Sequence, residues 1–324
     1  MCVRAPRLRF SIIFKSKLID VSIAVKVCGL FLLLSLTCAL GAGEAALSQD
    51  VARARVAVLD LGRMEEGRRT ADSLASSLSS DARLAIVDRE QGRAAVLGAG
   101  YNGSLNMTLE EARDLGAAIG CDFFITGAAQ TLRRSPSVGP TYYEAYAAVF
   151  IVSARTGLLL MWERPSFEAA TPAEAEKLLH AELKSGPKRS SYADAIRRAQ
   201  ESERSSRALL AQSHGVPVIE DAPDDEEQAR ARGLRLPQPY RRLRPPYTEA
   251  AARMEAEATV DVQVLIGADG EVGRIDVVRW AGFGLDEATT ATVGQLHFRP
   301  AMRGGRPIPM RVLLRYNFRR PPKQ

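Results

Sequence analysis

The chain has 324 residues, of which 46% are hydrophobic and 25% are charged. This balance excludes a wholly disordered chain, a collagen-like protein and a protein with many membrane spans. The length allows two domains of roughly 100–200 residues each. The net charge of +6 would point to nucleic acid or an acidic membrane as a partner if it were spread over the whole chain.

Part of the positive charge lies in the first 45 residues, which carry six basic side chains and two acidic ones. The run from Val27 to Gly43 has no charge and is rich in leucine. A basic start, an apolar core and small residues after it are typical of an export signal. The run is also at the lower length limit of a membrane-spanning helix. We therefore predict that residues 1–45 are a signal peptide or an inner-membrane anchor and that the chain lies in the periplasm or cell envelope.

Residues 46–211 are predicted to form an α/β domain with a mixed sheet and helices, because strand and helix patterns alternate along them. Runs rich in β-branched residues predict the strands, and apolar residues three and four positions apart predict the helices. Capping boxes begin at Thr108 and Thr171 and mark two helix starts. The predicted strands are 55–62, 83–88, 122–127, 142–153 and 158–168, and the predicted helices are 70–80, 90–97, 108–120, 171–184 and 192–212.

One glycine-rich motif in this region matches the sequence pattern of a dinucleotide-binding site. Residues 98–103 match G-x-G-x-x-G, but that site needs a strand directly before the glycines and a helix that opens on them. Here the preceding segment has a helical pattern, and the next helix begins at Thr108. We therefore predict a loop at residues 98–103 and no cofactor.

Four short sequence runs in the first region follow one another in an order that is also found in a known protein family. VAVLDLG, ADSLASSL, RLAIVDREQ and ARDLGAAIGCDFFITGAAQ follow one another within residues 54–165. Their order resembles the envelope domain shared by the TolB amino-terminal region and the CsgG/FlgO group. Those families are parts of envelope assemblies and are not enzymes, so the resemblance implies a role in protein assembly.

Residues 212–239 differ from their surroundings, since an acidic patch, an arginine patch and prolines follow one another without apolar periodicity. We predict a charged, proline-containing linker there. The acidic cluster within it could be imagined as a metal site, but without an apolar framework a solvated charge run is the preferred interpretation.

Residues 240–324 are predicted to form a second domain, with a net charge of +5 from 14 basic and nine acidic side chains. Residues 258–266 alternate between apolar and polar, as a half-buried strand does. An Asp-Gly turn at Asp269 joins them to a returning strand at 272–280. The predicted helices are 248–254 and 284–296, and the predicted last strand is 309–318.

The second region resembles the TonB C-terminal domain of the energy transducer TonB family over residues 240–320. The runs RPPYTEAAAR, TVDVQVLIGADGEV, IDVVRWAGFGLDEATTATV and HFRPAMRGGRPIPMRVLLRYNF carry the resemblance. It implies a small antiparallel sheet packed with two helices, whose last strand captures a partner peptide by strand addition. The implied peptide-binding edge consists of Pro309, Met310, Arg311, Val312, Leu313, Leu314, Arg315, Tyr316, Asn317 and Phe318.

The resemblance implies an outer-membrane TonB-dependent receptor, or another envelope protein, as the partner. Two functions stay open: energising outer-membrane transport with an ExbB/ExbD-type motor, or an adaptor role without energy transduction. No His precedes His180, whereas motor-coupled members of the family carry one in their anchor. No nucleophile motif, metal spacing or phosphate loop is found, and the arginines of the second region are scattered. We therefore expect neither enzyme activity nor nucleic-acid binding.

Overall fold

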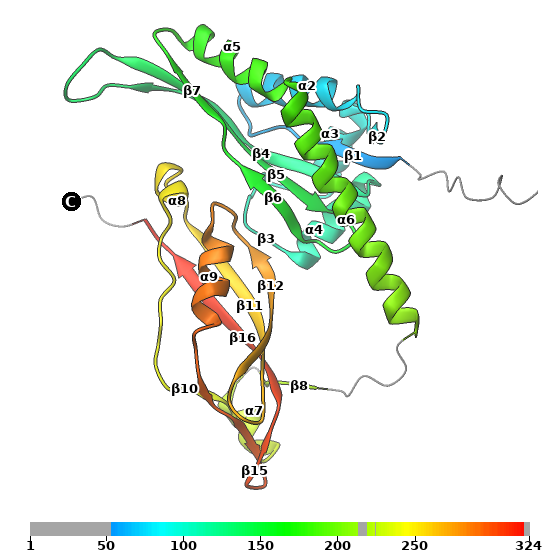
Figure 1. The fold of residues 1–324 in the computed structure, drawn as a ribbon, viewed down its shortest axis with the longest axis vertical. Helices are drawn as coiled ribbons and strands as arrows, with labels where there is room; N and C mark the ends of the chain where they lie inside the picture. The colour runs from blue at the N-terminus through cyan, green and yellow to red at the C-terminus, as the bar shows by residue number, and fades with distance from the viewer. Residues whose placement is uncertain (1–52, 213–218, 224, 321–324) are drawn as a thin grey trace, which may run out of the picture. The chain divides into compact units, whose positions relative to one another are not determined.

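A computed structural model describes residues 53–212, 219–223 and 225–320 of the chain. The predicted signal or anchor at 1–45 lies outside the described residues. From Arg53 onward the chain forms one compact unit. Figure 1 shows its elements in colours that follow the sequence.

The first part of this unit is a mixed sheet with the strand order β2-β1-β4-β5-β6, in which β7 also pairs with β5. Strand β1 is parallel to β2 and β4, and the other pairs are antiparallel. The prediction of a mixed sheet with helices is confirmed. The strands are β1 (Ala54–Val58), β2 (Leu84–Ile86), β4 (Phe123–Arg134), β5 (Tyr142–Ser153), β6 (Leu159–Glu163) and β7 (Ser166–Ala169).

Helices cover both faces of this sheet because each carries one apolar stripe. Residues of α2, α5 and α6 share a core with one face, and residues of α4 share a core with the other. Side-chain caps begin three of the helices: Asp88 for α3, Thr108 for α4 and Thr171 for α5. The helices are α2 (Glu65–Leu78), α3 (Arg89–Gly98), α4 (Leu109–Ile119), α5 (Pro172–Leu183) and α6 (Gly186–Gln212).

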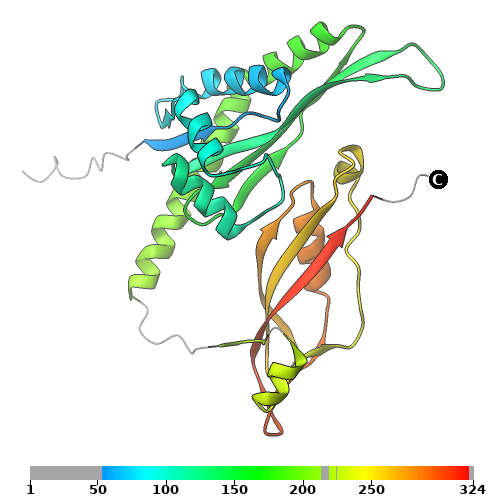
Figure 2. The same ribbon diagram turned by 180° about the vertical axis from the view of Figure 1, so that it is seen from behind.

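The second sheet has the strand order β3-β12-β11-β16-β8, and Figure 2 shows β16 in red beside β11. Alternate residues of β11 are buried beneath α9 and form the centre of the core. Strand β3 was not predicted, because it is only two residues long and depends on its pairing with β12. The elements are β3 (Met107–Thr108), β8 (Glu220–Asp221), α8 (Glu249–Arg253), β11 (Ala258–Ile266), β12 (Val272–Trp280), α9 (Leu285–Val293) and β16 (Met310–Phe318).

The segment predicted as a solvated linker, 212–239, is folded in its described part. Ala229 and Leu234 are buried in a small cluster with Ala301 and Met310. Each of its strands is short and pairs with a strand of the C-terminal region. Strands this short show no apolar-polar alternation in the sequence, so they were not predicted. The elements here and at the same end of the molecule are α7 (Glu226–Ala231), β9 (Leu234–Arg235), β10 (Gln238–Pro239), β13 (Phe298–Arg299), β14 (Ala301–Arg303) and β15 (Arg306–Ile308).

Candidate functional site

Strand β16 holds all the predicted peptide-binding residues except Pro309, which directly precedes it. Along one edge, β16 pairs with β11 over its whole length. Along the other edge, its described pairing is confined to Met310 and Arg311, which face β8. The outer edge from Val312 to Phe318 therefore has no strand partner within the described part of the chain.

Unused backbone groups alternate along this edge. The carbonyl oxygen of Arg311 points outward, since it accepts a hydrogen bond from the amide of Ala222 at 2.7 Å. In an antiparallel pair, the amide and carbonyl of one residue point to the same side and alternate with those of the next. The backbone groups of Leu313, Arg315 and Asn317 therefore also point outward, where an added strand could bind them.

The side chains of β16 present two different faces. Leu314 and Tyr316 are partly buried against the same core as α9, opposite Val262 and Val260 of β11. Leu313 lies on the other face and is 57% exposed. An added strand would thus find apolar neighbours on both sides of its backbone.

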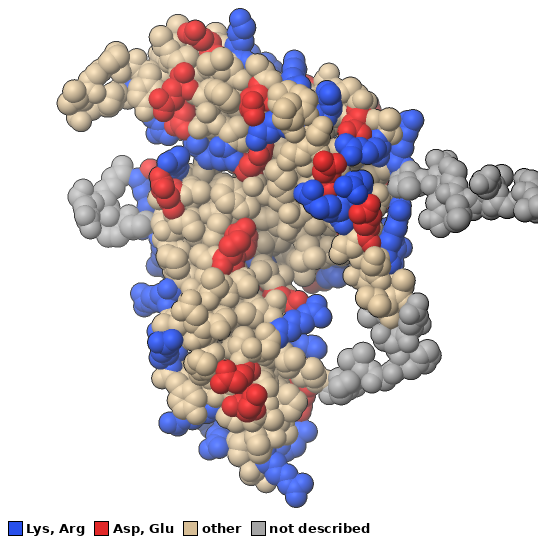
Figure 3. All heavy atoms as spheres, in the orientation of Figure 1, with Lys and Arg blue, Asp and Glu red and all other residues tan. Residues whose placement is uncertain are grey.

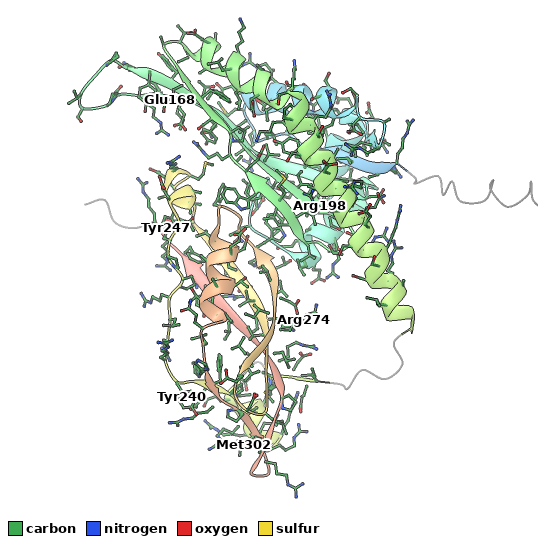
Figure 4. The ribbon with its side chains drawn as sticks, viewed as in Figure 1. Glu168, Arg198, Tyr240, Tyr247, Arg274 and Met302 are labelled. Carbon is green, nitrogen blue, oxygen red and sulfur yellow. The ribbon has the colours of Figure 1, made fainter. Side chains whose placement is uncertain are left out.

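A groove follows the outer edge of β16. It encloses about 740 Å³ and lies between residues 314–319 and the extended segment 239–245, with Leu296 and Phe298 also in its wall. Tyr240 and Tyr247, labelled in Figure 4, mark the course of that segment beside the C-terminal sheet. The hydroxyl of Tyr247 donates to the carbonyl oxygen of Ala256 at 2.8 Å and lies 3.1 Å from that of Ala251, which fixes the end of the segment against α8.

The groove is basic. Five arginines and no acidic residue line it, and Figure 3 shows Lys and Arg side chains along this flank of the C-terminal sheet. Arg315 is bound to Asp261, and Arg241 donates to the carbonyl oxygen of Gln295 at 3.5 Å. The remaining three have no ion-pair partner among the described residues, so their charge is available to a ligand: Arg242, Arg244 and Arg319.

Asp261 is a buried carboxylate on the sheet face away from α9. It accepts hydrogen bonds from Nε and Nη2 of Arg315 at 2.8 and 3.0 Å, and Arg279 lies 3.5 Å away. The bonded carboxylate raises the pKa of the Arg315 guanidinium. The interaction fixes the Arg315 side chain. It thereby also holds the outward amide and carbonyl of Arg315 in position. The sequence offered only one signal of this role, a charged residue within an apolar strand.

Asp286 is a second buried carboxylate, at the start of α9. It accepts hydrogen bonds from the amides of Ala281 and Gly282 at 2.9 and 2.7 Å. Burial raises the pKa of Asp286 to about 6. The turn that it holds directly follows Trp280 of β12, whose Nε1 donates to the carbonyl oxygen of Gly157 at 3.0 Å. Asp286 therefore supports the sheet and does not line the groove.

The G-x-G-x-x-G motif is not placed between a strand and a helix. Gly98 is the last residue of α3, and the chain then continues through Gly103 to β3. The positive φ values of Gly100 and Gly103 belong to this connection.

The C-terminal region matches one family model. Residues 244–319 match the Gram-negative bacterial TonB protein C-terminal family. The family predicted for this region is confirmed. The match includes β16 and begins at Arg244, so the earlier part of the basic segment lies outside it. A search of curated proteins finds no match.

Several solved structures are similar to parts of the chain. The hypothetical protein CT253 of Chlamydia trachomatis is 13% identical, with 41% of this chain and 94% of that chain covered and a TM-score of 0.30. The TonB C-terminal domain of Pseudomonas aeruginosa is 21% identical, covering 27% and 90% with a TM-score of 0.24. The LpoB C-terminal domain of Salmonella enterica is 16% identical, covering 35% and 81% with a TM-score of 0.24. At these scores no functional conclusion follows from them.

None of the helices in the described residues is both long and apolar enough to span a bilayer. The resemblance of residues 54–165 to the TolB and CsgG/FlgO domains stays a prediction.

Proposed function

We propose that this chain binds an extended, acidic segment of a partner protein by adding it as a strand to β16. The observation that carries the proposal is the outer edge of β16 from Val312 onward, which has no strand partner among the described residues and lies beside a groove lined by arginines and by no acidic residue. In strand addition, backbone hydrogen bonds supply affinity and alternate side chains supply selectivity. The outward backbone groups of Leu313, Arg315 and Asn317 provide the hydrogen bonds. The apolar and basic walls of the groove provide the selectivity.

The partner that fits this chemistry is an envelope protein with an extended acidic stretch, as an outer-membrane TonB-dependent receptor would offer. The family match at residues 244–319 supports this class of partner. The chain then works by protein contact in the cell envelope and has no catalytic role. Two versions of this function differ in whether the contact transmits force.

In the first version the chain is an energy transducer coupled to an ExbB/ExbD-type motor, and in the second it is a periplasmic adaptor. The two are separated by replacing residues 1–45 with a cleavable signal peptide. Co-purification of a motor complex with the original chain, lost on this replacement, supports the transducer. Unchanged behaviour of both forms supports the adaptor.

The basic groove is tested by reversing its three unpaired charges with Arg242→Glu, Arg244→Glu and Arg319→Glu. The probe is a fluorescein-labelled peptide, Thr-Val-Glu-Val-Glu-Val-Thr, and its binding is followed by fluorescence anisotropy. We expect the dissociation constant to rise about tenfold or more, because each reversal replaces a weak attraction with a repulsion of similar size.

The matched control carries the same charge change at exposed arginines that have no ion-pair partner among the described residues and lie outside the groove: Arg204→Glu, Arg232→Glu and Arg306→Glu. Its affinity should stay within about twofold to threefold of the unmodified chain. Equal losses in both triple variants, or equal binding of the same peptide with lysine in place of glutamate, would show that the groove does not select an acidic strand.

A further inference from the structure

Strand β8 already occupies the beginning of the edge assigned to the partner. It runs parallel to β16, with Glu220 opposite Met310 and Asp221 opposite Arg311. The amide of Ala222 completes the contact with its hydrogen bond to the carbonyl oxygen of Arg311. An extended piece of this chain is thus bound to β16 in the way proposed for the partner.

The charges of this contact match those expected for the ligand. Asp221 Oδ1 lies 3.0 Å from Nη1 of Arg311, and Glu220 forms an ion pair with Arg303. Strand β8 is therefore both extended and acidic, and arginines near the edge hold it.

We propose that β8 is a built-in competitor, which a partner strand must displace before it can pair with the whole of β16. The inference rests on the proposed function, because it assigns a regulator to the same edge. While β8 is in place, only the part of the edge from Val312 onward is open. A partner that covers Met310 and Arg311 as well takes over the positions of β8.

The contact of β8 is weak enough to be displaced. It is two residues long, and its ion pair between Asp221 and Arg311 is solvent-exposed, with side-chain exposures of 65% and 37%. Exposed ion pairs contribute little to stability. No described strand other than β16 pairs with β8, so its release leaves the rest of the sheet intact.

The same segment is nevertheless kept close to the edge. Asp225 caps α7 through the amide of Gln228 at 2.7 Å, and Ala229 and Leu234 are buried against Ala301 and Met310. This small cluster tethers β8 a few residues from its binding position. A tethered strand competes at a high effective concentration even when its own affinity is low.

A reversible lock tests the inference in the full chain. Asp221 and Arg311 are direct neighbours on the two strands, so the double variant Asp221→Cys, Arg311→Cys can form a disulfide between them. Cys2, Cys28 and Cys38 are replaced by Ser. Cys121 is kept, because burial raises its pKa to about 12 and leaves it unreactive at neutral pH. Binding is measured before and after reduction with a labelled acidic peptide long enough to pair from Met310 to Phe318, because a shorter strand can pair from Val312 onward without displacing β8.

The oxidised form should bind the peptide at least tenfold more weakly than the reduced form of the same protein. If the oxidised and reduced forms both bind the peptide with the same affinity, β8 is not a competitor, but the proposed function still holds. Binding by neither form, in a variant with the thermal unfolding of the unmodified chain, would overturn both.

A charge variant gives a second measurement that does not depend on forming the disulfide. Glu220→Lys with Asp221→Lys should loosen β8 and tighten peptide binding several-fold. Glu226→Lys with Glu227→Lys makes the same charge change on the exposed side of α7 and should leave the affinity unchanged. Equal effects of the two variants, or none from the first, would count against the competitor.

Discussion

Asp261 and Asp286 are buried carboxylates that support the binding edge without facing the ligand. Asp261 fixes Arg315 on the sheet, and Asp286 holds the turn before α9 through two backbone amides. Both neutralise part of the cost of burial with hydrogen bonds. They differ in that Asp261 has charged partners, whereas Asp286 has only backbone donors.

The raised pKa of Asp286 predicts a specific pH dependence of stability. With a folded pKa of about 6 and an unfolded pKa near the ordinary value, the folded state binds more protons between about pH 4 and pH 6. Stability from this group therefore falls as the pH rises through that window, by about 3 kcal/mol in total.

The measurement compares the free energy of unfolding of the unmodified chain and Asp286→Asn, in denaturant titrations at pH 4 and pH 7. The variant lacks the titrating group, so the difference between the two proteins isolates it. The unmodified chain should lose about 2–3 kcal/mol relative to the variant on going from pH 4 to pH 7. A difference that is constant or rises with pH would contradict this assignment.

At the scale of the elements, close backbone approach fixes how strands and helices meet. Gly157 lies in the connection from β5 to β6 with a φ of +75°, and an added Cβ would come within 2.1 Å of the carbonyl oxygen of Leu109 at the start of α4. The carbonyl of Gly157 also accepts the Trp280 indole. This position therefore joins α4, the first sheet and the turn before α9.

Gly157→Ala should destabilise the chain by several kcal/mol, because the backbone of Leu109 must move in addition to the cost of a positive φ. The matched control is Gly100→Ala, whose φ of +68° is similar but whose added Cβ meets nothing within 4 Å. The control should cost only about 1 kcal/mol. Chemical denaturation measures both, and equal losses would refute the clash as the cause.

The elements with their own periodicity were predictable from the sequence, and those that depend on a partner strand were not. The alternation in β11 and the capping box of α4 locate both elements directly. By contrast, β3, β8, β9 and β10 are two residues long and exist through pairing with distant strands. The basic wall formed by residues 239–245 was missed for the same reason, since only the tertiary fold brings it beside β16.

For the whole molecule, the distribution of charge agrees with a division of roles. The positive charge of the predicted export segment lies in residues 1–45, and the net charge of residues 240–324 is +5. Part of this second surplus lines the groove beside β16 and has no acidic partner there. The overall charge of +6 therefore comes mainly from residues 1–45, with a net charge of +4, and from residues 240–324.

Strand addition to the outer edge of β16 predicts a specific pattern of amide hydrogen exchange along this strand. In the free chain, the amides of Val312, Leu314 and Tyr316 face β11 and should exchange slowly. The outward amides of Leu313, Arg315 and Asn317 should exchange fast and become protected when the acidic peptide binds. Binding that leaves these three amides unprotected, or that protects a different part of the chain, would contradict the account.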